Sequence, residues 1–111
     1  MPLPTLDVFQ VIADKNRREI LHLLTKESLT INHLADNFPI SRPAVSKHIK
    51  ILQEAGFISI RDQGRERYCT IQKEGFDRLR EWIQYFDSFW AAKFAKLESI
   101  LNNTKNNQHG K

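Results

Sequence analysis

The sequence has only one cysteine, Cys69, among its 111 residues. A single thiol cannot form a disulfide within the chain, which excludes a disulfide-stapled fold and agrees with a reducing compartment. No apolar run approaches the roughly 20 residues that a membrane-spanning helix needs. The N-terminus also lacks the charged-then-apolar pattern of a signal peptide. We therefore expect a cytoplasmic protein.

The sequence also lacks the patterns of an enzyme. It contains no glycine-rich phosphate loop, and no nucleophile, base and orienting acid form a recognisable constellation. The composition, with 41% hydrophobic and 27% charged residues, is ordinary for a globular domain. A chain of 111 residues can build a core without disulfides or structural metal. The prediction is a non-enzymatic protein with one domain over residues 1–101.

Positive charge is concentrated in one part of the chain. The net charge is +4, from 17 Lys or Arg against 13 Asp or Glu. Residues 41–73 hold seven of the basic and three of the acidic residues, so the remainder is balanced. This distribution is typical of a surface that binds a polyanion. A basic membrane-binding surface is the alternative, but the segment lacks the exposed aromatic face of an interfacial helix.

Residues 30–56 are predicted to form a short helix, a tight turn and a longer helix. The short helix is expected over residues 30–38, where Thr30 starts it and Pro39 ends it. Ser41 is a suitable N-cap for the longer helix, because its hydroxyl can accept a hydrogen bond from a free amide of the first turn. Gly56 is suited to end that helix, since glycine adopts the left-handed conformation without a Cβ clash.

The longer helix has two chemically different faces. Val45, Ile49 and Leu52 recur at helical spacing and form an apolar stripe that must pack inward. The opposite face offers cations and neutral hydrogen-bonding groups without a carboxylate, which suits phosphate oxygens and base edges. A solvated helix face is the alternative, but a helix-turn-helix places its second helix in the DNA major groove. The residues predicted to contact DNA here are Ser41, Arg42, Pro43, Ser46, Lys47, His48 and Lys50, with His48 either touching phosphate or packing.

After Gly56 the apolar period changes from three and four residues to two. The alternating segments on either side of Asp62, Gln63 and Gly64 predict a β-hairpin. A basic hairpin directly after a helix-turn-helix is a wing, which can follow the DNA backbone or enter the minor groove. A sheet edge kept soluble by charge is the alternative. The basic residues assigned to DNA binding in this hairpin are Arg61, Arg65 and Arg67.

Two helices are expected before residue 30. The first begins near Thr5 and is apolar on more than one side, so it needs two neighbours. Asp14 or Asn16 caps the second, which starts with Arg17 and Arg18. These arginines can reach phosphate, or they can be neutralised by nearby acids.

A long amphipathic helix is expected from about residue 73 to residue 101. Its apolar stripe exceeds what the small core can cover, so we expect a second copy of the chain to cover it. An aromatic ligand pocket at residues 82–90 is the alternative. Residues 102–111 are polar and are expected to be a disordered tail. The residues assigned to dimerisation are Leu6, Phe9, Trp82, Phe86, Phe89, Trp90, Phe94 and Leu97.

The chain resembles the ArsR/SmtB-type winged helix-turn-helix repressors. The resemblance rests on ADKNRREILHLL at 13–24, FPISRPAVSKHIKILQEAGFI at 38–58 and RDQGRERYCTI at 61–71. It implies a homodimer joined by the first and last helices, with two recognition helices in successive major grooves of an inverted repeat. It also implies transcriptional repression. Lys15 and Asn16 depart from the usual Asp-Pro-Thr-Arg-Arg motif, so the ordering effect of the proline is lost.

The metal sites of that family do not carry over to this sequence. Residues 30–38 contain no cysteine for a thiolate site, and the predicted last helix has carboxylates but no histidine. His33 stands alone, without nearby soft ligands. Cys69 lacks a resolving partner, which argues against a redox sensor. We therefore predict no metal site and no cofactor, and leave a small-molecule effector open.

The predicted fold is mainly α with a small β-hairpin, in the order α-α-α-α-β-β-α. The predicted function is a homodimeric DNA-binding repressor of an inverted-repeat operator that does not respond to metal. The alternative is a winged-helix interaction module whose basic face binds an acidic partner.

Overall fold

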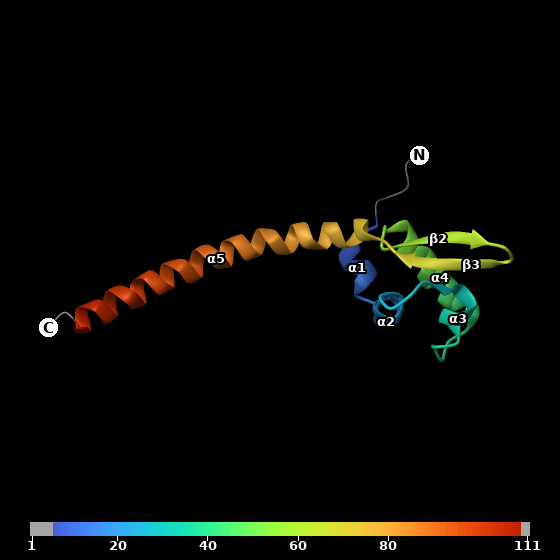
Figure 1. The fold of residues 1–111 in the computed structure, drawn as a ribbon, viewed down its shortest axis with the longest axis horizontal. Coiled ribbons are helices and arrows are strands. Elements are labelled where there is room, and N and C mark those ends of the chain that lie inside the picture. Colours follow the sequence, from blue (N-terminus) through green and yellow to red (C-terminus); the bar gives the residue numbers. More distant parts are fainter. Residues whose placement is uncertain (1–5, 110–111) are drawn as a thin grey trace. The chain divides into compact units, whose positions relative to one another are not determined.

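The computed structural model describes residues 6–109, with side chains described as far as residue 104. It forms two compact units, Met1–Leu79 and Arg80–Lys111. The predicted order of four helices, a hairpin and a last helix is confirmed, with one additional short strand. The elements are α1 (Val8–Ile12), α2 (Lys15–Leu24), β1 (Leu29–Thr30), α3 (Ile31–Ala35), α4 (Arg42–Glu54), β2 (Ile58–Gln63), β3 (Glu66–Ile71) and α5 (Lys73–His109) (Figure 1).

Each of the first four helices begins at a polar side chain that accepts a backbone amide. Asp7, Asp14, Thr30 and Ser41 accept hydrogen bonds of 2.9–3.2 Å from amides two or three residues later. These bonds satisfy donors that the first turn of a helix leaves without intrahelical partners. The predicted start near Thr5 lies outside the described residues, and α1 instead begins after Asp7.

The helix α3 is shorter than predicted. It ends at Ala35, whereas the sequence indicated a helix as far as residue 38. The Asn37 side chain donates to the His33 carbonyl at 3.0 Å and so takes the place of a continuing helical amide. Pro39 further disfavours a helical backbone at the residue before it.

The core of the first unit forms where α4 packs against α2, α3 and the sheet. Val45, Ile49 and Leu52 are at most 1% exposed, which confirms the predicted inward stripe of α4. Burial of an aliphatic side chain of this size contributes about 1.5–3 kcal/mol. The largest fully buried side chains are Phe57, Ile20, Leu34, Ile49, Leu52, Val45 and Cys69.

The sheet is antiparallel, with the strand order β1-β3-β2. The hairpin runs from the pair Ile58 and Ile71 to the pair Gln63 and Glu66. Gly64 at its tip has a φ of 64°, a conformation that glycine adopts at little cost. The strand β1 was not predicted, because two residues are too few to show a period.

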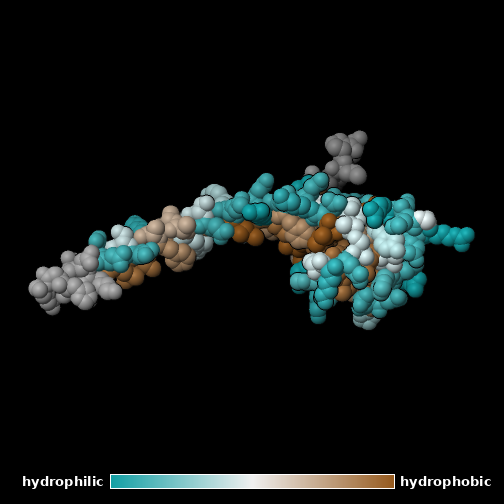
Figure 2. Space-filling view, in the orientation of Figure 1, coloured by the Kyte–Doolittle hydropathy of each residue, from teal (hydrophilic) through white to brown (hydrophobic). Residues whose placement is uncertain are grey.

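The helix α5 belongs partly to each unit. From Arg80 to Thr104 every side chain is exposed in the single chain. Figure 2 shows apolar side chains, in brown, gathered along one side of this part of the helix. The predicted single domain of residues 1–101 thus includes the first unit and most of the second, and stays a prediction.

The predicted disordered tail is helical as far as His109, while residues 110 and 111 lie outside the described part. Gly110 is the first glycine or proline after Gly75, so no earlier residue of those types interrupts the helix. Within residues 6–109, no helix combines the length and the apolar character that crossing a membrane requires.

Candidate nucleic-acid interface

The outer face of α4 presents a set of exposed polar side chains. Val45, Ile49 and Leu52 hold the helix from the inside, so the residues between them must face outward. This face carries no carboxylate as far as Gln53. The predicted residues that are exposed on it are Ser41, Arg42, Pro43, Ser46, Lys47 and Lys50.

Arg42 differs from the two lysines because its guanidinium is already engaged. Its Nη1 donates to Oδ1 of Asn32 at 3.2 Å, and its Nη2 lies 3.7 Å from Oδ1 of Asp36. Both ends of the ion pair are about two-thirds exposed, so the pair itself stabilises little. These contacts hold the beginning of α4 to α3 and lower the positive charge that Arg42 offers to a ligand.

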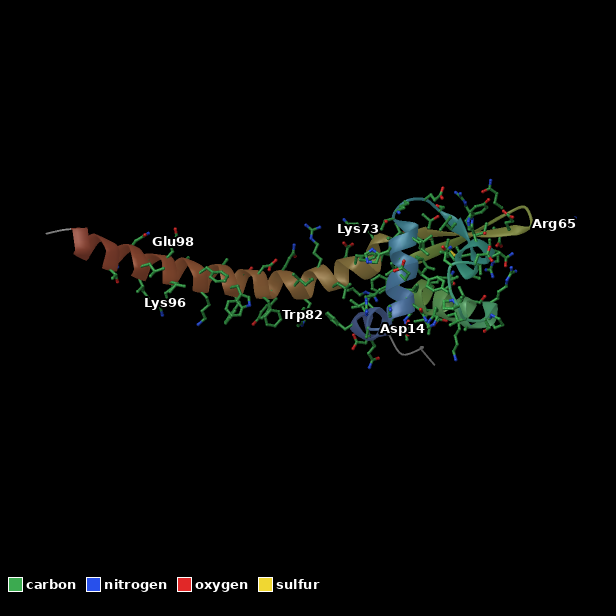
Figure 3. All side chains as sticks on the ribbon, turned by 90° about the horizontal axis from the view of Figure 1, so that it is seen from below. Asp14, Arg65, Lys73, Trp82, Lys96 and Glu98 are labelled. Carbon is green, nitrogen blue, oxygen red and sulfur yellow. The ribbon has the colours of Figure 1, made fainter. Side chains whose placement is uncertain are left out.

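The hairpin adds three exposed arginines to the surface. Arg65 lies at the tip, directly after Gly64 (Figure 3). Arg67 donates through Nε to Oδ1 of Asp62 at 3.1 Å, across the two strands. Within residues 6–104, neither Arg61 nor Arg65 has an ion pair with a carboxylate of the chain. These two side chains retain their full charge for an anionic ligand.

The helix and the hairpin form one continuous surface. Two adjoining grooves run between them, and Ile31, Ser46 and Arg67 line both. Lys50 and Gln53 extend the second groove along α4. The first groove reaches the hairpin tip and the beginning of α3. The further residues of that first groove are Thr30, Asn32, Arg65 and Glu66.

Sequence patterns did not assign three polar residues of the first groove to DNA contact. Thr30 and Asn32 lie at the beginning of α3, and Glu66 is on the hairpin. Glu66 accepts a hydrogen bond from the Tyr68 hydroxyl at 3.1 Å, and this bond raises the pKa of Tyr68. The grouping of these three residues in one groove depends on how the hairpin and α3 approach each other, which local spacing does not encode.

His48 lies deeper than the other predicted contact residues. Its side chain is 19% exposed, and Nδ1 lies 3.2 Å from Nη1 of Arg17 and 3.9 Å from Oδ1 of Asp14. His48 thus packs against the beginning of α2, which is one of the two roles left open by the sequence.

The arginines at the beginning of α2 serve the end of α1. Arg17 donates to the carbonyls of Val11 at 2.6 Å and Gln10 at 3.3 Å. Arg18 donates to the carbonyls of Ile12 at 2.8 Å and Ala13 at 2.9 Å. These carbonyls lie at the end of α1, where a helix leaves acceptors without intrahelical donors, although that of Gln10 also accepts the Ala13 amide at 3.3 Å. The sequence offered neutralisation by nearby acids as the structural alternative. Within residues 6–104 the two arginines instead donate to backbone carbonyls, and neither forms an ion pair with a carboxylate.

The family's metal sites have no matching donor set in the described part of the chain. Residues 6–104, whose side chains the structure describes, contain no group of three His, Cys, Asp or Glu side chains placed to hold an ion. Cys69 is fully buried on β3, and burial raises the pKa of its thiol to about 11. His109, assigned to the tail from the sequence, is the last residue of α5.

The residues assigned to dimerisation lie on two elements. Leu6 directly precedes α1, and Phe9 on α1 is 40% exposed. The others lie on α5 in the second unit and are between 39% and 61% exposed. Several of their rings contact one another along the helix, such as Trp82 and Phe86 with centroids 4.6 Å apart.

A family match, related sequences and solved structures all identify the same class of protein. Residues 14–59 match the family described as bacterial regulatory protein, arsR family. The chain is 37% identical over 94 residues to the HTH-type transcriptional regulator Rv2034 of Mycobacterium tuberculosis (strain ATCC 25618 / H37Rv), covering 85% of each protein. It is 34% identical over 80 residues to the transcriptional repressor SdpR of Bacillus subtilis (strain 168), covering 72% of this chain and 89% of that protein.

A solved structure supports the assignment. The crystal structure of a possible transcriptional regulator for arsenical resistance is 44% identical, with a TM-score of 0.66, over 77% of this chain and 85% of that one. These similar proteins are regulators, which confirms that the chain is not an enzyme. The chain belongs to the arsR family of bacterial regulatory proteins and is a transcriptional regulator with a DNA-binding winged helix-turn-helix.

Proposed function

We propose that the chain is a homodimeric repressor that binds an inverted-repeat operator through α4 and the β2–β3 hairpin. The observation that carries this proposal is the continuity of the two elements, because Ser46 of α4 and Arg67 of the hairpin line the same grooves. A recognition helix in a major groove then brings the hairpin to the adjacent backbone or minor groove.

The exposed groups of the surface divide by chemistry. Lys47 and Lys50 are flexible point charges suited to phosphate, whereas the Ser46 hydroxyl is short and suited to a base edge or a nearby phosphate. Pro43 offers an apolar ring that can contact a thymine methyl group. Arg65 at the hairpin tip is suited to the negative potential of a minor groove. His48 packs inward and is assigned a supporting role.

Dimerisation is supported by the apolar surface of α5. Trp90, Phe94 and Leu97 are each more than half exposed in the single chain. Side chains of this size, repeated along one helix, leave far more apolar area in water than scattered surface residues do. A second copy offers an identical stripe and closes the interface with two-fold symmetry. Two α4 helices then reach half-sites about one helical turn apart.

Repression without a metal signal is the third part of the proposal. Its support is the lack of a three-ligand group among the side chains of residues 6–104 and the burial of Cys69. We expect addition of zinc, arsenite or cadmium, or removal of metals by a chelator, to leave operator affinity unchanged. Metal-dependent release of the DNA would contradict this part and leave the DNA-binding part intact.

Selection of genomic DNA fragments with the purified protein tests the main proposal. Enrichment of an inverted repeat is the expected result, and a reporter placed behind that repeat is expected to be repressed. Recovery of no enriched sequence would overturn it and would favour the interaction module, whose basic face binds an acidic partner. Activation of the reporter would contradict repression alone.

A further inference from the structure

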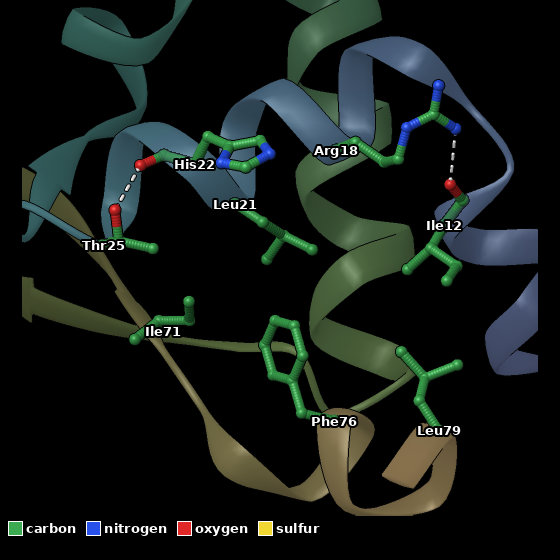
Figure 4. Close-up of a pocket in the computed structure, with 8 residues that line it drawn as sticks. All are labelled: Ile12, Arg18, Leu21, His22, Thr25, Ile71, Phe76 and Leu79. Carbon is green, nitrogen blue, oxygen red and sulfur yellow. Dashed lines mark hydrogen bonds between the residues drawn. The ribbon is translucent and has the colours of Figure 1, made fainter. Parts of the chain in front are cut away.

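An apolar cavity lies apart from the DNA-binding surface, between α1, α2, the end of β3 and the first turns of α5. It belongs wholly to the first unit, and its volume is about 230 Å³. None of the residues assigned to DNA contact or to dimerisation lines it. Its lining consists of Ile12, Arg18, Leu21, His22, Thr25, Ile71, Phe76 and Leu79 (Figure 4).

The floor and walls of the cavity are hydrocarbon. Figure 4 shows Leu21, Ile71, Phe76 and Leu79 pointing towards the same space from three different elements. Phe76 is held in place by an edge-to-face contact with the buried Phe57, at 4.9 Å between ring centroids. Pockets that bind small molecules are typically lined in this way, with a few polar groups to orient the ligand.

Two basic side chains line the cavity, and both come from α2; the Thr25 hydroxyl, which also lines it, donates to the His22 carbonyl at 2.6 Å. Arg18 and His22 are four residues apart and therefore share one side of that helix. The Arg18 guanidinium is anchored through Nη1 to the carbonyls of Ile12 and Ala13. Its Nε and Nη2 groups have no hydrogen-bond partner within residues 6–104, and no carboxylate lines the cavity.

We propose that this cavity binds a small monocarboxylate whose apolar body fills the space between α2 and α5. The planar guanidinium of Arg18 suits a carboxylate, and His22 can supply a further N–H donor. At roughly 30 Å³ for each water-sized group, the volume accommodates a ligand of about eight non-hydrogen atoms. Hexanoate and benzoate are suitable probes. An effect of the ligand on operator affinity rests, in addition, on the proposed function.

Calorimetric titration of the full chain with sodium hexanoate tests the site without DNA, so its result is independent of operator binding. We expect saturable binding of hexanoate, and much weaker binding of acetate and 1-hexanol, because one lacks the apolar body and the other the charge. The double variant Arg18→Gln with His22→Gln is expected to weaken hexanoate binding at least about tenfold.

Lys15→Gln is the matched control, since it removes an exposed cation of α2 that does not line the cavity. It is expected to leave hexanoate affinity unchanged. Should the double variant fail to fold, His22→Gln alone serves, because His22 is exposed. Amide chemical-shift changes in the wild-type protein are expected to centre on Leu21, His22 and Thr25.

Three outcomes would overturn the proposal: no saturable heat with hexanoate or benzoate, equal affinity of the wild type and the variants, or shift changes away from the lining. A side chain of a second copy is the competing occupant. In that case hexanoate would bind only when dilution dissociates the dimer, which would also contradict a carboxylate site in the assembled protein. If the protein binds hexanoate but the genomic selection enriches no operator, the carboxylate site stands and the proposed function is refuted.

Discussion

At the beginning of α2, Asp14 combines a helix cap with an electrostatic contact to the recognition helix. Its Oδ1 accepts the Arg17 amide at 3.0 Å and lies 3.9 Å from Nδ1 of His48. Burial acts to raise the pKa of Asp14, but the Arg17 amide and the attraction of His48 and Arg17 outweigh it and lower that pKa. The Asp14 carboxylate therefore stays ionised at neutral pH beside the Arg17 guanidinium and the His48 imidazole.

Arg17 is expected to stabilise the first unit by joining α1, α2 and α4. The change Arg17→Met removes its donors to the Val11 carbonyl and to His48, and leaves those acceptors without a partner. We expect the free energy of unfolding, measured in urea, to fall by about 1–3 kcal/mol. The change Lys15→Met at an exposed position of the same helix should alter it by less than about 0.5 kcal/mol. Equal effects of the two changes would refute the role of Arg17.

Cys69 is expected to be chemically inert in the folded protein. Burial raises the pKa of its thiol to about 11, while Arg67 acts in the opposite direction. At pH 8 a thiol reagent should react with Cys69 only as fast as the protein unfolds. Above the pKa of the unfolded thiol, stability should fall as the pH rises towards 11, because only the unfolded chain then releases the proton. The variant Cys69→Ala should lose that dependence. Rapid labelling of the native protein would contradict the prediction.

At the scale of elements, α4 and the hairpin are proposed to act on DNA mainly through charge. We expect Lys50→Ala to weaken operator binding and to reduce the slope of log affinity against log salt by about one, if Lys50 contacts one phosphate. Titration of operator DNA by fluorescence anisotropy at several salt concentrations measures both quantities. Lys26→Ala, at an exposed position outside the surface, is the control. An unchanged slope in Lys50→Ala would remove the phosphate contact from the proposal.

The junction between α5 and the core depends on a close approach of backbone to an aromatic ring. A Cβ atom on Gly75 would lie 2.7 Å from Cγ and Cδ1 of Phe57, which is fully buried. We expect Gly75→Ala to lower the free energy of unfolding by about 1–3 kcal/mol through overpacking. In a Phe57→Leu background, Gly75→Ala should lower the free energy of unfolding by less. A double-mutant cycle measures the difference. Additive costs would show that Phe57 is not the obstacle.

Local chemistry made much of this architecture predictable. Caps at Thr30 and Ser41, the stripe of α4 and the glycine-tipped hairpin all follow from residues close in sequence. The strand β1 was missed because its two residues are held by pairing with Cys69 and Tyr68, far along the chain. The contact between Arg17 and His48 likewise spans 31 positions. Groove residues such as Asn32 depend on the same long-range packing.

For the whole molecule, association is expected to depend on α5. Phe89→Glu places a charge within the apolar stripe, so we expect sedimentation at micromolar concentration to show weaker self-association than for the wild type. Ser88→Glu adds the same charge at the neighbouring exposed position, outside the stripe, and should associate like the wild type. Because both positions lie beyond the first unit, neither change should unfold it. A monomeric wild-type protein would refute the dimer.

The separation of the two faces of α4 also affects how this protein can evolve. Folding depends on the inward stripe, whereas Ser46, Lys47 and Lys50 are exposed. Substitutions at such exposed positions usually change stability by less than about 0.5 kcal/mol. A lineage can therefore exchange its outward residues one at a time and acquire a new DNA preference while the inherited scaffold persists.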